Sequence, residues 1–132
     1  AMSSPSITAS DLVAEARASI RETSPSGFHA SPGDAVVIDV REPAEFETGH
    51  IPGSINIPRG VLEFQVDAHP AVANVSDPAL SHKERSVVVV CRTGGRAALS
   101  ALNLQRLGFT DVRSIEGGIV GWEAAGLPLT QR

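Results

Sequence analysis

The residue best suited to chemistry is Cys91, the only cysteine of the 132-residue chain. It follows four consecutive valines, Val87 to Val90, and precedes the polar sequence R-T-G-G-R. A thiolate is a strong nucleophile, and it needs no neighbouring base where its surroundings already favour ionisation. The alternative is a small buried and inert cysteine at a strand end, but the charged and glycine-rich flanks of Cys91 are unlike the apolar surroundings of that kind of residue.

The sequence after Cys91 favours an anion. Helix formers predominate from Arg96 to Leu107, so the loop leads into a helix start whose backbone N–H groups lack partners within the helix. Two glycines let the backbone approach the sulfur closely, and two arginines add positive charge. These features favour the thiolate form and an anionic substrate. We therefore expect five residues to form the substrate- or persulfide-binding loop: Arg92, Thr93, Gly94, Gly95 and Arg96.

The elements around this loop alternate between strand and helix patterns. An unbroken β-branched run, as in residues 87–90, is typical of a strand buried on both faces of a parallel sheet. Such sheets bind ligands at the carboxyl ends of their strands, where Cys91 lies. We predict strands over residues 35–40, 54–57, 87–90 and 112–115. We predict helices over residues 9–22, 42–48, 59–65, 96–107 and 120–125.

The helix pattern that begins near Ala9 is preceded by Thr8, which with Asp11 resembles a capping box. Residues 23–34 are rich in serine, proline and glycine and are expected to form a loop. Prolines and polar residues in the segment 66–85 argue against one regular element there, and we assign that segment no function. Together the elements predict an α/β fold with a mostly parallel sheet flanked by helices.

Three blocks of sequence resemble the rhodanese-like (thiosulfate sulfurtransferase) family. They are C-R-T-G-G-R from Cys91, D-V-R-E-P-A-E-F-E-T-G-H-I-P-G-S-I-N-I-P over residues 39–58, and E-G-G-I-V-G-W-E-A-A-G-L-P-L over residues 116–129. They occur in the order found in that family. The resemblance implies one rhodanese-like domain of three layers over residues 1–132, and we expect residues 1–6 to be a disordered N-terminus.

The resemblance also implies an activity, that of a rhodanese-type thiosulfate sulfurtransferase. Cys91 would take sulfane sulfur from thiosulfate or a related small anionic donor and hold it as a persulfide. It would pass that sulfur to a thiophilic acceptor, either cyanide or a thiol, and a protein thiol is among the acceptors considered. Asp39, Arg41 and Glu45 either form an anion site or a structural network near the catalytic edge, and bidentate arginine–carboxylate pairing favours the network. No cofactor is expected.

Two other readings of the cysteine stay open. Some phosphatases and arsenate reductases share a rhodanese-like fold, but their His-Cys-x5-Arg pattern requires histidine at position 90 and arginine at position 97. This chain has Val90 and Ala97, so its loop is one residue shorter and is better suited to a persulfide sulfur than to a phosphoryl group. A non-catalytic persulfide carrier or interaction domain is the second alternative, although such domains usually lack the cysteine.

The amino-acid composition limits the kinds of binding partner and site that we expect. The net charge of −4 gives no reason to expect nucleic acid or an anionic membrane surface as a partner, and no apolar run is long enough to cross a membrane. A single cysteine excludes an intramolecular disulfide and a C-x-x-C site. The four histidines lack ligand spacing, so no metal is expected, and His50 is assigned to packing or to turn hydrogen bonds. These features suit a reducing cytoplasm.

Overall fold

A five-stranded parallel sheet forms the centre of the protein. The computed structural model describes residues 6–66, 80 and 82–132. The strands are β1 (Arg21–Thr23), β2 (Val36–Asp39), β3 (Ile55–Asn56), β4 (Val87–Val90) and β5 (Val112–Ile115). Their order in the sheet is β1-β5-β4-β2-β3, and every neighbouring pair is parallel. The predicted α/β class is confirmed, and the described sheet is wholly rather than mostly parallel.

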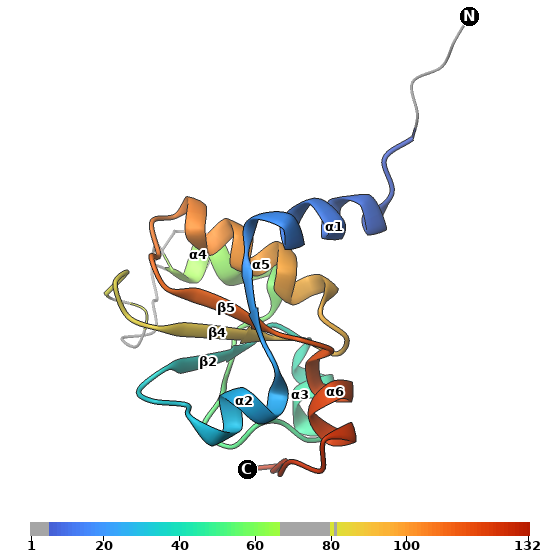
Figure 1. Cartoon of the computed structure of the whole chain (residues 1–132), viewed down its shortest axis with the longest axis vertical. Coiled ribbons are helices and arrows are strands. Elements are labelled where there is room, and N and C mark those ends of the chain that lie inside the picture. Colours follow the sequence, from blue (N-terminus) through green and yellow to red (C-terminus); the bar gives the residue numbers. More distant parts are fainter. Residues whose placement is uncertain (1–5, 67–79, 81) are drawn as a thin grey trace, which may run out of the picture.

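Helices cover both faces of this sheet (Figure 1). They are α1 (Ala9–Ser19), α2 (Pro25–Ala30), α3 (Pro43–Glu47), the 3-10 helix η1 (Arg59–Val61), α4 (Leu62–Val66), α5 (Gly95–Arg106) and α6 (Gly118–Ala124). Helices α1, α4 and α5 lie on one face, and α2, α3 and α6 lie on the other (Figure 1). The result is the three-layer arrangement that the sequence predicts.

The valine run of β4 explains why this strand is central. Val87 and Val89 belong to the apolar cluster beneath α5, whereas Val88 and Val90 belong to the cluster beneath α2 and α6. Side chains alternate between the faces of a strand, so a strand that is apolar at every position is suited to helical layers on both sides. All four valines are fully buried. Cys91, the next residue, therefore sits at the carboxyl end of the most enclosed strand described.

The N-terminal region departs from the sequence prediction. Helix α1 begins at Ala9 behind the predicted capping box, in which the Thr8 hydroxyl accepts from the Asp11 N–H. It ends at Ser19 rather than at residue 22, because β1 follows at once and pairs with β5 at the sheet edge. The predicted loop over residues 23–34 is also wrong in part. It contains α2, which Ser24 caps and which has proline in its first turn.

The remaining elements follow the prediction more closely. The strand at 112–115 has the predicted bounds, and α5 differs by one residue at each end. Helix α6 begins at Gly118, two residues before the predicted start. The expectations for residues 1–6 and for the segment 66–85 fall largely outside the described residues. Within the described part of the chain, none of the helices has the length and apolar character needed to cross a membrane.

Candidate active site

The Cys91 side chain lies where β4 leads into the loop before α5. Only 1% of the residue is exposed. Its Sγ accepts hydrogen bonds from the backbone N–H of Gly94 at 3.0 Å and from that of Ala97 at 3.3 Å. Both donors belong to the start of α5, where N–H groups have no partner inside the helix. The free amides of a helix start are thus directed at the sulfur, and they favour negative charge on it.

Gly94 makes this curl of the backbone possible. Its φ of 114° lies in the region that side-chain-bearing residues rarely adopt. A Cβ at this position would also lie 2.8 Å from Nη2 of Arg17, which reaches the loop from α1. The loop therefore requires glycine here for its backbone conformation, and its outer side faces a guanidinium group from outside the predicted loop.

The start of α6 holds the same loop from its other side. The N–H of Ile119 donates to the carbonyl oxygen of Cys91 at 2.8 Å, and that of Val120 donates to the carbonyl oxygen of Arg92 at 3.0 Å. Gly118 lies so close that a Cβ there would collide with both carbonyl oxygens. With these two carbonyls fixed by α6, the amides that follow in the loop are free to point at the sulfur.

Arg96 forms a bidentate ion pair with Glu45 of α3. Its Nη1 and Nη2 atoms donate to the two carboxylate oxygens at 2.7 and 2.9 Å. The hydrogen bonds from Arg96 lower the pKa of Glu45 to about 2, against an ordinary value of 4.5. The same bonds raise the pKa of the Arg96 guanidinium. The charge of Arg96 therefore already has a carboxylate partner.

Asp39 and Arg41 form a second pair, and this one is buried. The Asp39 side chain is 0% exposed and that of Arg41 is 5% exposed. The guanidinium donates from Nε and Nη2 to the carboxylate, and Nη2 also donates to the carbonyl oxygen of Gly49 at 2.7 Å. The sequence grouped these two residues with Glu45, whereas Glu45 makes its ion pair with Arg96. Two pairs thus flank the loop: the Asp39–Arg41 pair is buried, and the Arg96–Glu45 pair is partly exposed.

The other loop residues face outward. Arg92 and Thr93 are exposed. Arg92 lines a cleft of about 270 Å³ together with Glu45 of α3 and Val120 of α6. Thr93 and Gly95 line a separate cleft beneath α1. The loop therefore lies between two surface clefts, with the sulfur behind it.

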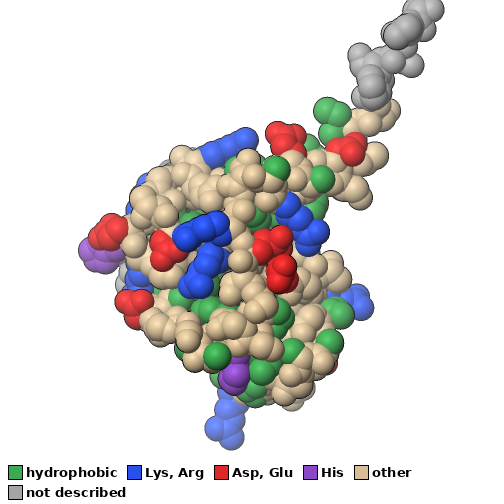
Figure 2. Space-filling model, viewed as in Figure 1, with side chains coloured by type: hydrophobic (Ala, Val, Ile, Leu, Met, Phe, Trp, Pro, Cys, Tyr) green, Lys and Arg blue, Asp and Glu red, His purple; other side chains and the backbone are tan. Residues whose placement is uncertain are grey.

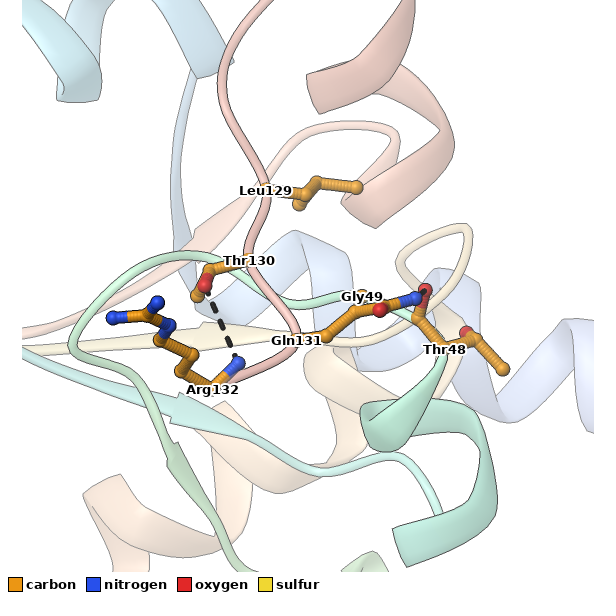
Figure 3. A pocket seen from close by; sticks show the side chains of 6 residues that line it. All are labelled: Thr48, Gly49, Leu129, Thr130, Gln131 and Arg132. Carbon is orange, nitrogen blue, oxygen red and sulfur yellow. Dashed lines mark hydrogen bonds between the residues drawn. The ribbon is translucent and has the colours of Figure 1, made fainter.

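A further cleft, of about 600 Å³, lies at the C-terminal segment and carries none of this chemistry (Figure 3). It is lined by Thr48, Gly49, Leu129, Thr130, Gln131 and Arg132. The side chains labelled in Figure 3 include no cysteine, histidine or carboxylate. Nearby His50 is buried and stacks on Phe46 at 3.6 Å, and its two ring nitrogens lie within hydrogen-bond distance of carbonyl oxygens. His50 therefore packs and bonds within the fold, as its sequence block indicated.

Among the described residues, no group of three or more histidine, cysteine, aspartate or glutamate side chains is arranged to hold a metal ion. Trp122 is buried in the cluster beneath α6, where its indole N–H donates to the carbonyl oxygen of Pro128.

The protein thus has a parallel sheet whose central strand ends at a cysteine bonded by backbone amides. Comparison with known protein families shows which class of protein has this arrangement. The family model of the rhodanese-like domain matches residues 27–125. The chain belongs to this family.

Individual relatives agree with that assignment. A protein named sulfurtransferase from Allochromatium vinosum is 30% identical over 96 residues, which cover 73% of this chain and 78% of that protein. The thiosulfate sulfurtransferase GlpE of Pseudoalteromonas translucida is 32% identical over 97 residues, covering 70% and 76%. A solved structure from Rhodopseudomonas palustris, described as a protein of unknown function and possible tyrosine phosphatase, is 32% identical with a TM-score of 0.84, and covers 98% of this chain and 99% of its own.

Two residues at the loop escaped the sequence analysis. Gly118 was part of a glycine pair before a predicted helix, and that pair was the available signal for a close approach of two backbones. No sequence pattern pointed to Arg17. Its position beside Gly94 depends on the packing of α1 against α5, and these two helices are far apart in the sequence.

Proposed function

We propose that the protein is a sulfurtransferase that moves sulfane sulfur through a persulfide on Cys91. The observation that supports this most directly is the Cys91 Sγ itself, which accepts N–H bonds from Gly94 and Ala97. Amide donors fixed in advance stabilise negative charge without reorganisation, as an oxyanion hole does for oxygen. A thiolate before the reaction and a persulfide anion after it both carry such charge.

In the first step the Cys91 thiolate attacks the outer sulfur of thiosulfate or of a related donor. A bond forms between Sγ and that sulfur, the donor's sulfur–sulfur bond breaks, and its electron pair leaves with sulfite. The exposed Arg92 attracts the donor anion, whereas Arg96, already paired with Glu45, positions the start of α5. Thr93, Gly94 and Gly95 complete the loop that surrounds the transferred sulfur.

In the second step an acceptor attacks the outer sulfur of the persulfide and regenerates the Cys91 thiolate. Cyanide would leave as thiocyanate, and a thiol, including one on a protein, would leave as a persulfide. This two-step scheme predicts ping-pong kinetics. A reducing cytoplasm suits it, because a lone thiol stays available there.

The phosphatase alternative is weaker for a reason visible at the loop. A phosphatase loop of the His-Cys-x5-Arg type needs a guanidinium at position 97 to hold the phosphoryl oxygens. Position 97 is a fully buried alanine, and the neighbouring Arg96 is paired with Glu45. We therefore expect negligible Cys91-dependent hydrolysis of aryl phosphates and no arsenate reduction.

The test is mass spectrometry of the protein after incubation with thiosulfate. We expect one sulfur atom to be added on Cys91, released by cyanide as thiocyanate, and absent in Cys91→Ser. Retention of most turnover by Cys91→Ser would overturn the proposal. Formation of the persulfide without multiple turnover would instead identify a persulfide carrier, and phosphatase turnover that depends on Cys91 would reverse the choice between enzyme classes.

A further inference from the structure

Helix α1 lies outside the matched rhodanese-like domain, yet it packs beside the catalytic loop. The family match begins at residue 27, whereas α1 covers Ala9–Ser19. Its packing partner is α5, the helix whose start surrounds the sulfur. Figure 1 shows α1 running alongside α5 and extending past it, away from the sheet. One wall of the candidate active site thus comes from a helix outside the matched residues 27–125.

That wall carries a guanidinium group. Arg17 Nη2 lies 2.8 Å from the place a Cβ would take on Gly94, the residue whose N–H donates to Cys91 Sγ. The described ion pair of Arg17 is with Glu22, through a single contact of 3.9 Å between Nε and the carboxylate. The Arg17 side chain is 44% exposed. Compared with Arg96, Arg17 is therefore loosely paired, and its Nη2 atom faces the loop.

Arg17 stands at the edge of a cleft with mainly apolar walls. The cleft has a volume of about 630 Å³ and lies between α1 and the residues Thr93 and Gly95. Its α1 side is lined by Ala9, Ser10, Val13, Ala14 and Arg17. Figure 2 shows basic side chains in the angle between α1 and the rest of the molecule. Small side chains along a helix, with one cation beside Gly94, suit a ligand with an apolar body and an anionic head.

We infer that α1 makes this site selective for organic sulfur donors that carry an anion, with Arg17 attracting the anion and the cleft receiving the organic group. The inference rests on the proposed sulfurtransferase function. An aryl thiosulfonate is a donor of this class. The Cys91 thiolate would form a bond to its outer sulfur, the bond between that sulfur and the sulfonyl sulfur would break, and the electron pair would leave with the aryl sulfinate.

The charge of Arg17 can be tested without any sulfur transfer. We expect iodoacetate and iodoacetamide both to alkylate Cys91. Only iodoacetate is an anion, so the ratio of the two alkylation rates cancels changes in the fraction of thiolate. We expect Arg17→Gln to lower the iodoacetate to iodoacetamide ratio about two- to fivefold, the effect of one partly screened charge. The matched control is Arg106→Gln at the far end of α5, which should leave the ratio unchanged.

The salt dependence of the alkylation ratio is a second test of the Arg17 charge. The ratios of the unmodified protein and of Arg17→Gln should converge as ionic strength rises, because salt screens exposed charges. A ratio unaffected by Arg17→Gln at low salt would overturn the role of Arg17, whatever the outcome of the sulfur-transfer assays. If the ratio falls but no persulfide forms from any donor, the proposed sulfurtransferase function fails and the donor selectivity fails with it.

The cleft itself is tested by filling it. Ala14→Phe places a ring among the cleft residues, whereas Ala18→Phe makes the same change on α1 at a position that does not line the cleft. We expect Ala14→Phe to reduce kcat/KM for benzenethiosulfonate at least about fivefold while thiosulfate, which is too small to need the cleft, is little affected. Equal effects of the two variants on both donors would overturn the proposed place of the organic group.

Discussion

The starts of α5 and α6 resemble each other in backbone but direct their free amides at different targets. Each helix follows a glycine in the left-handed region, Gly94 with φ 114° and Gly117 with φ 72°, and neither has a side-chain cap. At α5 two amides point at the Cys91 sulfur. At α6 two amides bond carbonyl oxygens of the loop that carries this sulfur. One helix start thus donates to the Cys91 sulfur, and the other fixes the backbone that presents this sulfur.

The two helix starts are also held in place differently. The first turn of α5 is tied to α3 by the side-chain pair between Arg96 and Glu45, which is partly exposed to solvent. The first turn of α6 is tied by backbone hydrogen bonds at a position where only glycine fits. A salt bridge between side chains can be weakened by a change of pH or salt concentration. Two backbone segments in close contact, by contrast, cannot move apart easily to accommodate an added Cβ atom.

The largest effect should come from Gly118→Ala. Its Cβ would meet backbone oxygens, which cannot move without displacing the loop, so we expect loss of nearly all persulfide formation. We expect its free energy of unfolding to fall by roughly 1–3 kcal/mol more than that of Gly33→Ala. Gly33 is the matched control, because its φ of 58° is close to the 59° of Gly118 and no atom lies within 4 Å of its added Cβ. If Gly118→Ala and Gly33→Ala lost equal amounts of stability in denaturant unfolding and equal amounts of activity, backbone strain alone would explain the effect.

A smaller and pH-dependent effect is expected for Glu45→Gln. The pKa of Glu45 is about 2 in the folded protein and near its ordinary 4.5 when unfolded, so the ion pair stabilises fully above pH 4.5. That contribution, about 0.5–1 kcal/mol for a partly exposed pair, is lost as pH falls towards 2. The stability difference between the unmodified protein and Glu45→Gln should shrink over the same range. The control in denaturant titrations is Glu47→Gln, which removes an exposed carboxylate from the same helix, and an identical trend in that variant would refute this origin.

The smallest effect is expected for Arg92→Ala, on the cleft side of the loop near α6. Arg92 is exposed, and removal of its charge should raise KM for thiosulfate about two- to fivefold with a smaller change in kcat. Steady-state kinetics at two ionic strengths measure both quantities. An unchanged KM with a large fall in kcat would mean that Arg92 acts in the transition state rather than in attraction of the donor.

Much of the sheet and the position of Cys91 could be predicted from local sequence. The strand at 87–90 has its predicted bounds because it is an uninterrupted apolar, β-branched run between two helical layers. The strand at 112–115, V-R-S-I, also has its predicted bounds, although its two middle residues are polar. The capping box at Thr8 fixed the start of α1, and Cys91 was placed at a strand end by the valines before it. In each case the signal and the structure lie within a few residues of each other.

The parts that were missed depend on distant partners. The three-residue strand β1, R-E-T, has no apolar alternation and exists because β5 offers an edge to pair with. The Arg96–Glu45 pair joins residues from two helices that local patterns cannot relate. Helix α2 is different, because Ser24 followed by proline is a local start signal. The high serine, proline and glycine content around α2 led to the prediction of a loop despite this start signal.

The position of β4 as the third of five strands bears on how the protein loses activity. Its amides are paired with β5 and β2, and helices cover both faces, so they should exchange with solvent only when the whole domain opens. The edge strands β1 and β3 are short and should open first. Partly opened molecules would keep Cys91 in its cradle, so inactivation by heat or denaturant should coincide with global unfolding rather than precede it.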